Sequence, residues 1–275
     1  LEHNILSAIA DCPNFTYAKN EENLGFVKTC NHSLELADPA TDILLLNSDT
    51  AVTEGFLTEM QEVLYADERH GAVCPRSNNA TLLTMPPRKN TTAELTPEVS
   101  HSIYETVKDM LPRWTILPTG VGFALLIKRD VLNRFGLFDE IYSPGYNEEN
   151  DFCARINQYG FSIVMANHAY VYHYESKSFG SRRAKLDAEH FAILNKRYPY
   201  YSNLISTYFH GGMEPVDYFA DLIGDGLYHK KRILFSLYET PASYNGTAKY
   251  SISIYEAFLR LYGDKYDVHL LINRA

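Results

Sequence analysis

The sequence predicts an α/β protein, in which a β-sheet is flanked by helices. Two observations carry this prediction. Residues 42–47 form a continuous apolar run that ends in polar residues, which is typical of a strand buried on both faces of a parallel sheet. An amphipathic helical pattern follows from Glu54 to Ala66, and Gly71–Cys74 then predicts the next strand.

The residues before this strand predict two helices with a short strand between them. Leu1, Ile5 and Ile9 are spaced four apart, which predicts a helix. Because the chain starts inside this helix without an initiator Met, we expect a piece of a longer protein. A strand is expected near Asn14–Ala18. The next helix opens at Asn23, with the apolar face Phe26, Cys30, Leu34 and Ala37.

The middle of the chain predicts a long segment outside the sheet, an excursion from the core, before the next strand. Residues 76–113 are rich in Pro, Asn and Thr, with a short helical pattern over 99–110. Gly120–Lys128 predicts a strand, and Asp130–Phe135 predicts a short helix that ends at Gly136.

A further helix is expected from Asn147 to Gly160, followed by strands at Phe161–Met165 and Ala169–Tyr172. Residues 198–231 show no clean period and predict a connecting region. Beyond it, the pattern predicts one β-α-β unit, too small to hold a core alone. Its parts are a strand at Arg232–Leu237, a loop at Thr240–Gly246, a helix at Thr247–Tyr262 and a strand at Tyr266–Ile272.

Composition excludes several classes of function. The 275 residues are 45% hydrophobic, which suits a globular protein, and the net charge of -9 gives no basic surface for nucleic acid. No apolar run approaches the roughly 20 residues that span a bilayer, and no signal peptide opens the chain. The four cysteines lack C-x-x-C spacing, so neither a zinc site nor a disulfide framework is predicted. A cytoplasmic location is expected, with peripheral association at the inner membrane face through the parent protein left open.

Three clusters of polar residues are candidates for chemistry. Asn47 and Asp49 follow the buried strand two residues apart, where ligands of open α/β sheets gather, and such oxygens bind divalent cations. An ordinary helix N-cap at Asp49 or Thr50 explains the same pattern. Residues 147–151, Asn-Glu-Glu-Asn-Asp, open a predicted helix. Acids suit a first helical turn, but one carboxylate here could also act as a general base.

The third candidate is His173 at the end of an aromatic strand, which could ligate a metal or donate to a phosphate, although a lone histidine is more often structural. Arg182 and Arg183 beyond it could meet a diphosphate or form a solvated basic patch.

These motifs resemble glycosyltransferase family 2, in particular its rhamnosyltransferase-like branch, over residues 14–200. Residues 23–26, Asn-Leu-Gly-Phe, with Asn31 are similar to the family's N-x-G-F...N segment beside the nucleotide. Residues 46–49, Leu-Asn-Ser-Asp, are similar to an N-x-D version of its metal-binding D-x-D signature.

The later motifs follow in the family's order. Residues 119–124, with Phe-Asp-Glu at 138–140 behind them, are similar to the donor-sugar and acceptor segment. Residues 146–153 resemble the family's Y-x-E-D-x-D-L-C, and His173 falls where that branch often has a histidine. One departure is that Glu149 stands where the family has its usual catalytic aspartate.

The resemblance implies a GT-A fold, a Rossmann-like mixed sheet flanked by helices, over 1–205. The family's first strands, which recognise the nucleotide base, would lie before Leu1. A connection over 206–231 would lead to 232–275, which resemble the first β-α-β unit of GT-B transferases of family 4. The parent would then carry two transferases in tandem.

The resemblance also implies a reaction. A hexose, or a deoxyhexose such as rhamnose, would move with inversion from a nucleoside-diphosphate sugar to a glycan or lipid-linked glycan acceptor in cell-surface polysaccharide synthesis. Glu149 would be the base, with Glu148 and Asp151 orienting the acceptor hydroxyl, and Asp49 and His173 would hold Mg²⁺ or Mn²⁺. The donor residues would be Asn23, Gly25, Asn31, Asn47 and Gly120.

Trp114 is a guess for a face that stacks on the acceptor sugar, although a sole Trp is more often plain packing. Two other functions stay open. One is a catalytically silent carbohydrate-binding or scaffolding module, which the missing strands and the Glu-for-Asp change favour. The other is a nucleotidyltransferase, against which the lack of a basic glycine-rich loop argues.

Overall fold

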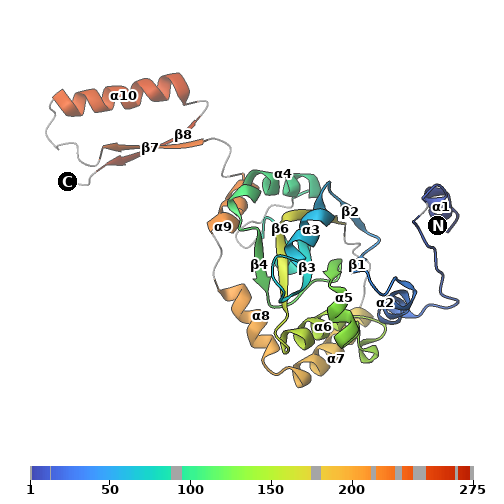
Figure 1. Cartoon of the computed structure of the whole chain (residues 1–275). Coiled ribbons are helices and arrows are strands. Elements are labelled where there is room, and N and C mark those ends of the chain that lie inside the picture. The colour runs from blue at the N-terminus through green and yellow to red at the C-terminus, as the bar shows by residue number, and fades with distance from the viewer. Residues whose placement is uncertain are drawn as a thin grey trace. The chain divides into compact units, whose positions relative to one another are not determined.

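The computed structural model describes residues 2–12, 14–87, 95–174, 181–211, 215–226, 231–237, 246–263 and 266–272 (Figure 1). The chain divides into two compact units. Unit 1 comprises Leu1–Leu83 and Leu111–Gly212, and unit 2 comprises Thr84–Met110 and Met213–Ala275.

Unit 1 is built on a mixed six-stranded sheet. Its strand order is β1 (Ile43–Leu46), β5 (Ala124–Ile127), β3 (His70–Arg76), β6 (Ser162–His173) and β2 (Thr50–Val52), and β4 (Trp114–Leu117) also pairs with β6. Strands β3 and β6 run parallel, and the other pairs run antiparallel. The predicted α/β class, a mixed sheet flanked by helices, is confirmed.

Alternate residues of the central strands face opposite sides of the sheet, as a period of two requires. Cys74 and Leu125 belong to the larger core, whereas Val73 and Leu126 belong to a second core under α3 (Phe56–Leu64). The helices that supply buried residues to the larger core are α2 (Gly25–Leu36), α5 (Arg129–Phe135) and α6 (Glu148–Asn157). Helix α6 therefore lies on the sheet face opposite α3.

The predicted helices of unit 1 are present. Helix α1 spans Glu2–Ile9, and α2, α3, α5 and α6 lie within two or three residues of their predicted limits. Helix α5 ends at Gly136, whose φ of 68° lies in the left-handed region that glycine tolerates best. Two short 3-10 turns, η1 (Thr81–Leu83) and η3 (Glu140–Tyr142), complete the connections.

The strand predicted over 42–47 is present as β1, but its predicted parallel and doubly buried surroundings were wrong. Among the described residues, β1 pairs with β5 alone, antiparallel and at one end of the strand order, and Leu46 is 44% exposed. A four-residue apolar run looks the same at the edge of a sheet as in its centre, because the pattern carries no information about neighbours. Residues 14–18 form no strand.

The two strands expected at 161–165 and 169–172 are one strand, β6. The polar pair Asn167 and His168 suggested a break, but Asn167 is buried in the strand. Its side chain accepts from Arg76 Nε (2.9 Å) and donates to the Pro112 carbonyl (2.9 Å). Strand β6 continues through this point and changes partners, from β3 and β4 to β2. Strands β2 and β4 were not predicted.

The region expected to be a connection contains helices. Unit 1 continues with α7 (Ser181–Arg197) and α8 (Tyr201–His210), and α9 (Pro215–Gly224) belongs to unit 2. The side chains of Arg182 and Arg183 lie outside the described residues, as do the residues around Gly212 and most of the predicted loop 240–246. The domain limits at 205 and 231 stay a prediction.

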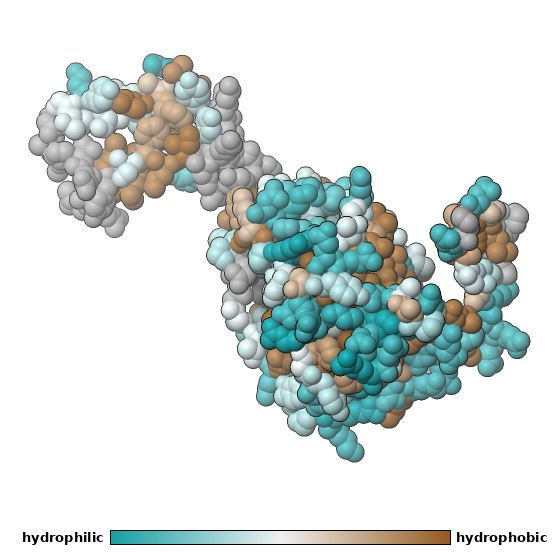
Figure 2. Space-filling view, viewed as in Figure 1, coloured by the Kyte–Doolittle hydropathy of each residue, from teal (hydrophilic) through white to brown (hydrophobic). Residues whose placement is uncertain are grey.

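Unit 2 contains a helix pair and the predicted β-α-β elements. Helix α4 (Pro97–Val107), followed by η2 (Lys108–Met110), packs against α9. Strands β7 (Lys231–Leu237) and β8 (Tyr266–Ile272) pair in parallel, and Phe235 packs on Tyr255 and Phe258 of α10 (Gly246–Tyr262). Figure 2 shows apolar surface over β7 and β8. The side chains of Leu234 on β7 and of Leu271 and Ile272 on β8 are exposed.

Candidate active site

The turn before α6 has an unusual backbone. Tyr146 and Asn147 both have positive φ, 77° and 69°, and Asn147 is the residue that precedes the first turn of the helix. Side-chain-bearing residues pay for this left-handed conformation, and such strain clusters at functional sites. Glu148 and Glu149 follow this turn directly, at the start of α6.

The start of α2 packs against this turn. Gly25 has a φ of 75°, and a Cβ on it would lie 2.6 Å from Pro144 Cβ, so only glycine fits. The Phe26 amide donates to the Pro144 carbonyl (2.7 Å), and Asn23 Oδ1 accepts from the Gly25 amide (3.0 Å). The predicted donor residues Asn23 and Gly25 thus lie against the turn that carries the predicted base.

Both glutamates hold carboxylate oxygens in poorly solvated positions. Glu148 is 6% exposed and Glu149 is half-buried, and Oε2 of each is buried without a hydrogen-bond partner among the described residues. Burial, and then the Glu149 charge, raise the pKa of Glu148 to about 8. Burial also raises the pKa of Glu149, the charge of Asp187 adds to this, and backbone N–H groups at Glu149 and Asn150 oppose it. Perturbed carboxyl groups of this kind are candidates for acid–base chemistry.

Asp49 and His173 are brought together at the ends of neighbouring strands. Thr50 pairs with His173 in the β2–β6 ladder, and His173 Nε2 lies 3.6 Å from Asp49 Oδ1. His173 Nδ1 lies 2.7 Å from the Asn79 carbonyl, which can only accept, so Nδ1 carries a proton. In the neutral ring Nε2 then presents its lone pair beside the Asp49 carboxylate.

These donors fit a divalent cation. Imidazole nitrogen and carboxylate oxygen both ligate Mn²⁺, and the Nδ1 hydrogen bond fixes the ring as an outer-shell partner of a metal ligand does. In the part of the chain that is described, no group of three or more His, Cys, Asp or Glu side chains is placed to hold a metal. Two protein ligands leave coordination positions for ligand oxygens, which is how Mg²⁺ is commonly held on phosphates.

The segment 122–123 joins the two groups. A Cβ on Gly122 would lie 4.0 Å from Glu149 Cβ and Cγ, so Glu149 borders the space in front of Gly122. Phe123 stacks on the His173 ring (centroids 5.0 Å apart), and its carbonyl accepts from the Asn47 amide (2.9 Å). Sequence reasoning passed over Gly122 and Phe123, although both lie within the motif at 119–124.

Four predicted residues serve the fold in this structure. Gly120 is buried, and a Cβ on it would meet Leu125 Cδ1 at 3.0 Å and the Cys74 and Cys153 sulfurs at 3.3 and 3.4 Å. Asn47 is half-buried, and its backbone carbonyl accepts from Thr50 Oγ1 (2.6 Å). Gly120 therefore allows close packing, and its role in donor binding stays a prediction.

The side chains of Asn31 and Asp151 also form hydrogen bonds within the protein. Asn31 donates to the Phe138 carbonyl (2.8 Å) and accepts from its amide (3.0 Å), which joins α2 to residue 138. Asp151 is 1% exposed and accepts from Arg197 Nη1 (2.9 Å) and the Tyr142 hydroxyl (3.1 Å). Their side chains anchor α2 and α6, and their roles toward a substrate stay predictions.

Trp114 lies away from the carboxylates. It begins β4, packs in the core under α3 and meets His70 edge-on (centroids 4.6 Å, 77°). Because α6 covers the other face of the sheet, this placement favours ordinary packing, and an acceptor role for Trp114 stays a prediction.

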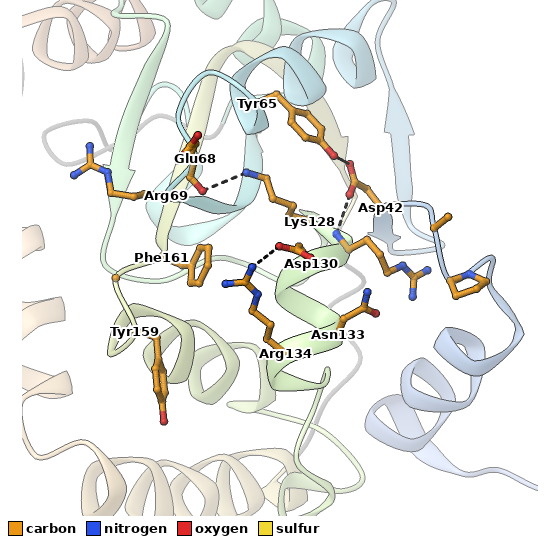
Figure 3. Close-up of a pocket in the computed structure, with 14 residues that line it drawn as sticks. Asp42, Tyr65, Glu68, Arg69, Lys128, Asp130, Asn133, Arg134, Tyr159 and Phe161 are labelled. Atoms are coloured by element: carbon orange, nitrogen blue, oxygen red, sulfur yellow. Dashed lines mark hydrogen bonds and ion pairs between the residues drawn. The ribbon is translucent and has the colours of Figure 1, made fainter.

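A pocket of about 800 Å³ lies at the opposite end of the strands (Figure 3). Its walls come from the residues that precede β1 and β3 and follow β5, including Asp42, Arg69 and Lys128. Its charged groups largely satisfy one another: Asp42 accepts from the Tyr65 hydroxyl (2.9 Å), and Asp130 pairs with Arg134 (2.7 Å). It contains none of the predicted site residues.

The sequence matches no protein-family model and no curated protein. Among the solved structures similar to this chain is a mannosyltransferase from Pyrobaculum calidifontis in complex with GDP-Man and Mn2+. The similarity covers 96% of this chain and 75% of that one, with 14% sequence identity and a TM-score of 0.43. At this extent the likeness does not decide function.

Among the described residues, no helix has the length and apolar character needed to cross a bilayer.

Proposed function

We propose that this chain is an inverting glycosyltransferase. It would move a hexose, or a deoxyhexose such as rhamnose, from a nucleoside-diphosphate sugar to a glycan or lipid-linked glycan in cell-surface polysaccharide synthesis. The observation that carries the proposal is the place of the Glu149 carboxylate beside Gly122, with one oxygen buried and without a hydrogen-bond partner in the described part of the chain. The adjacent Phe123 contacts His173 of the Asp49–His173 pair.

Glu149 is the general base of the proposed reaction. Its carboxylate takes the proton of an acceptor hydroxyl as that oxygen forms its bond to the anomeric carbon. The bond from this carbon to the diphosphate breaks on the opposite face, and the nucleoside diphosphate leaves with the electron pair. One carboxylate suffices because the configuration inverts in a single displacement.

Asp49 and His173 are the proposed cation ligands, for Mg²⁺ or Mn²⁺. A cation bound there would offset the negative charge that develops on the leaving diphosphate. The protein's part is to hold Nε2 of His173 and the Asp49 carboxylate side by side, which the Asn79 carbonyl and the β2–β6 pairing support. The acceptor hydroxyl would lie in the space in front of Gly122, which Glu149 borders.

The test measures release of nucleoside diphosphate by the protein over a panel of nucleoside-diphosphate sugars, with Mn²⁺ and with a chelator. We expect metal-dependent release that Glu149→Gln lowers by about 100-fold or more. Glu62→Gln is the matched control, because Glu62 is an exposed glutamate on α3 that pairs with Arg113.

Asp49→Asn and His173→Gln are expected to weaken Mn²⁺ binding in the presence of nucleoside diphosphate by about 10-fold or more. His168→Gln, on the same strand with its Nε2 3.3 Å from the Leu111 carbonyl, should leave Mn²⁺ binding unchanged. If the protein turns over no donor, or Glu149→Gln keeps full activity, the proposed function is overturned; glycan binding without turnover would favour the silent module.

A further inference from the structure

Helix α7 is tied to the turn that precedes Glu148. His190 on α7 is 5% exposed, and its Nδ1 lies 2.9 Å from the Gly145 carbonyl and 3.1 Å from the Tyr146 carbonyl. Both carbonyl oxygens can only accept, so Nδ1 carries a proton, and this N–H donates to both oxygens. The ring also meets Tyr142 edge-on, with centroids 5.6 Å apart, which fixes its orientation.

A second bond reaches the same turn from the same face of α7. Asn147 Nδ2 donates to Asp187 Oδ1 at 2.8 Å. Asp187 precedes His190 by three residues, and side chains three apart lie next to each other on a helix. Three consecutive residues of the turn, 145–147, are therefore held by one face of one helix.

This turn needs such support. Tyr146 and Asn147 both have positive φ, a conformation that persists only where the surroundings determine it. The carboxylates of Glu148 and Glu149 follow directly, so a relaxed turn would move both of them. A shift of about 1 Å in a reacting group can cost on the order of 100-fold in rate.

We infer that His190 is a positioning residue of the proposed transferase: its hydrogen bond to the Gly145 and Tyr146 carbonyls holds the turn that sets Glu149 in place. The inference rests on the proposed function for its kinetic consequence. The contact itself stands independently of any reaction.

Two variants separate the hydrogen bond from the space that the ring fills. His190→Leu removes the donor, whereas His190→Asn keeps an N–H donor close to the position of Nδ1. We expect kcat to fall about 10- to 100-fold in His190→Leu with the donor KM changed less than about 3-fold, and His190→Asn to recover most of kcat.

His70 provides the matched control. It is 2% exposed, and its Nδ1 lies 2.7 Å from the Val63 carbonyl under α3, on the other face of the sheet. His70→Leu removes the same kind of buried hydrogen bond, so it should cost stability and leave kcat of the folded protein unchanged.

The decisive readout is hydrogen exchange of the 145–149 peptide by mass spectrometry, at a temperature where all variants are folded. We expect faster exchange there in His190→Leu than in wild type, His190→Asn or His70→Leu. Unchanged exchange at 145–149, or a kcat loss equal to that of His70→Leu, overturns the inference. If the wild type turns over no donor, the proposed function fails, and the exchange result alone decides whether His190 holds the turn.

Discussion

Glu148 and Glu149 are held where a charge is costly. Acids in a first helical turn gain roughly 0.3–1 kcal/mol from the helix dipole. Burial of an ionised carboxylate without a partner costs far more, and the group raises its pKa instead. Since each glutamate has a buried oxygen without a hydrogen bond among the described residues, desolvation decides the direction of both shifts.

The raised pKa of Glu149 predicts the pH range in which activity is lost on the acid side of the pH profile, the acid limb. A base acts only when deprotonated, so kcat/KM should fall as pH drops through its pKa, by about 10-fold per pH unit below it. Because burial raises that pKa, the limb should lie above the usual glutamate range. A pH profile of kcat/KM measures it. A limb at or below about pH 4.5 would contradict this account of Glu149.

The raised pKa of Glu148 predicts that Glu148→Gln stabilises the protein at high pH but not at low pH. The folded pKa, about 8, lies above the unfolded value, so the stability that Glu148 contributes is full below the usual glutamate pKa and is lost as pH rises through about 8. The glutamine variant stays neutral. Its melting temperature should exceed that of wild type by about 3 °C or more at pH 9, with no gain near pH 4.

Thermal unfolding across pH 4–9 checks the prediction, with Glu62→Gln as the exposed control. A gain that is equal at both pH values would mean that packing, and not the buried charge, causes it.

The candidate site could be predicted only where the polar residues form a local pattern. Asp49, Glu149 and His173 follow predicted strands or open a predicted helix, and the structure brings Asp49 and His173 together. Gly122 and His190 carry no such signal, because a glycine facing a carboxylate and a histidine bonded to a carbonyl 45 residues away are known only from the fold.

At the scale of elements, the start of α2 holds the turn before α6 through Gly25. Gly25→Ala combines a left-handed φ of 75° with a Cβ 2.6 Å from Pro144 Cβ. Gly55, before α3, has the same φ with nothing within 4 Å of its Cβ, which makes Gly55→Ala the matched control.

We expect Gly55→Ala to lose about 1 kcal/mol of unfolding free energy from backbone strain alone. Gly25→Ala should lose about 2–4 kcal/mol, because Pro144 must also move, and its turnover should fall with the displaced turn. Urea unfolding and kcat measure both. Equal losses in the two variants would show that the contact with Pro144 does not matter.

The helices were the more predictable elements, because amphipathic periodicity over ten or more residues is a strong local signal. The strands were less so. The run in β1 indicated apolar surroundings but not an edge position. The polar residues Asn167 and His168 suggested a break in β6, whose partner strands come from distant parts of the chain. Sheet neighbours depend on topology, which no short window contains.

At the scale of the whole molecule, unit 2 takes a segment from the middle of the chain. Residues 84–110 lie in it together with 213–275, so the predicted excursion belongs to a different unit from the strands on either side of it. The end of α9 packs on this segment: a Cβ on Gly224 would lie 3.3 Å from Leu95 Cδ1 and 3.7 Å from Ile103 Cδ1.

This arrangement predicts different outcomes for two truncations. A chain ending at Gly226 loses β7, α10 and β8 but keeps α9 beside α4, and should retain its melting temperature within about 2 °C. A chain ending at Gly211 uncovers the α4 face and should melt about 5 °C or more lower, with increased binding of a hydrophobic dye. Equal melting of the two fragments would contradict a stabilising role for α9.

Strand β1 has a consequence for how the protein behaves at high concentration. It ends the strand order, and its sequence, Ile-Leu-Leu-Leu, has neither the proline nor the lysine with which natural sheets blunt an edge. A row of amide and carbonyl groups on its outer side has no strand partner among the described residues. Such a row is a template on which another extended segment can add, so the solubility of this chain depends on what shields that edge.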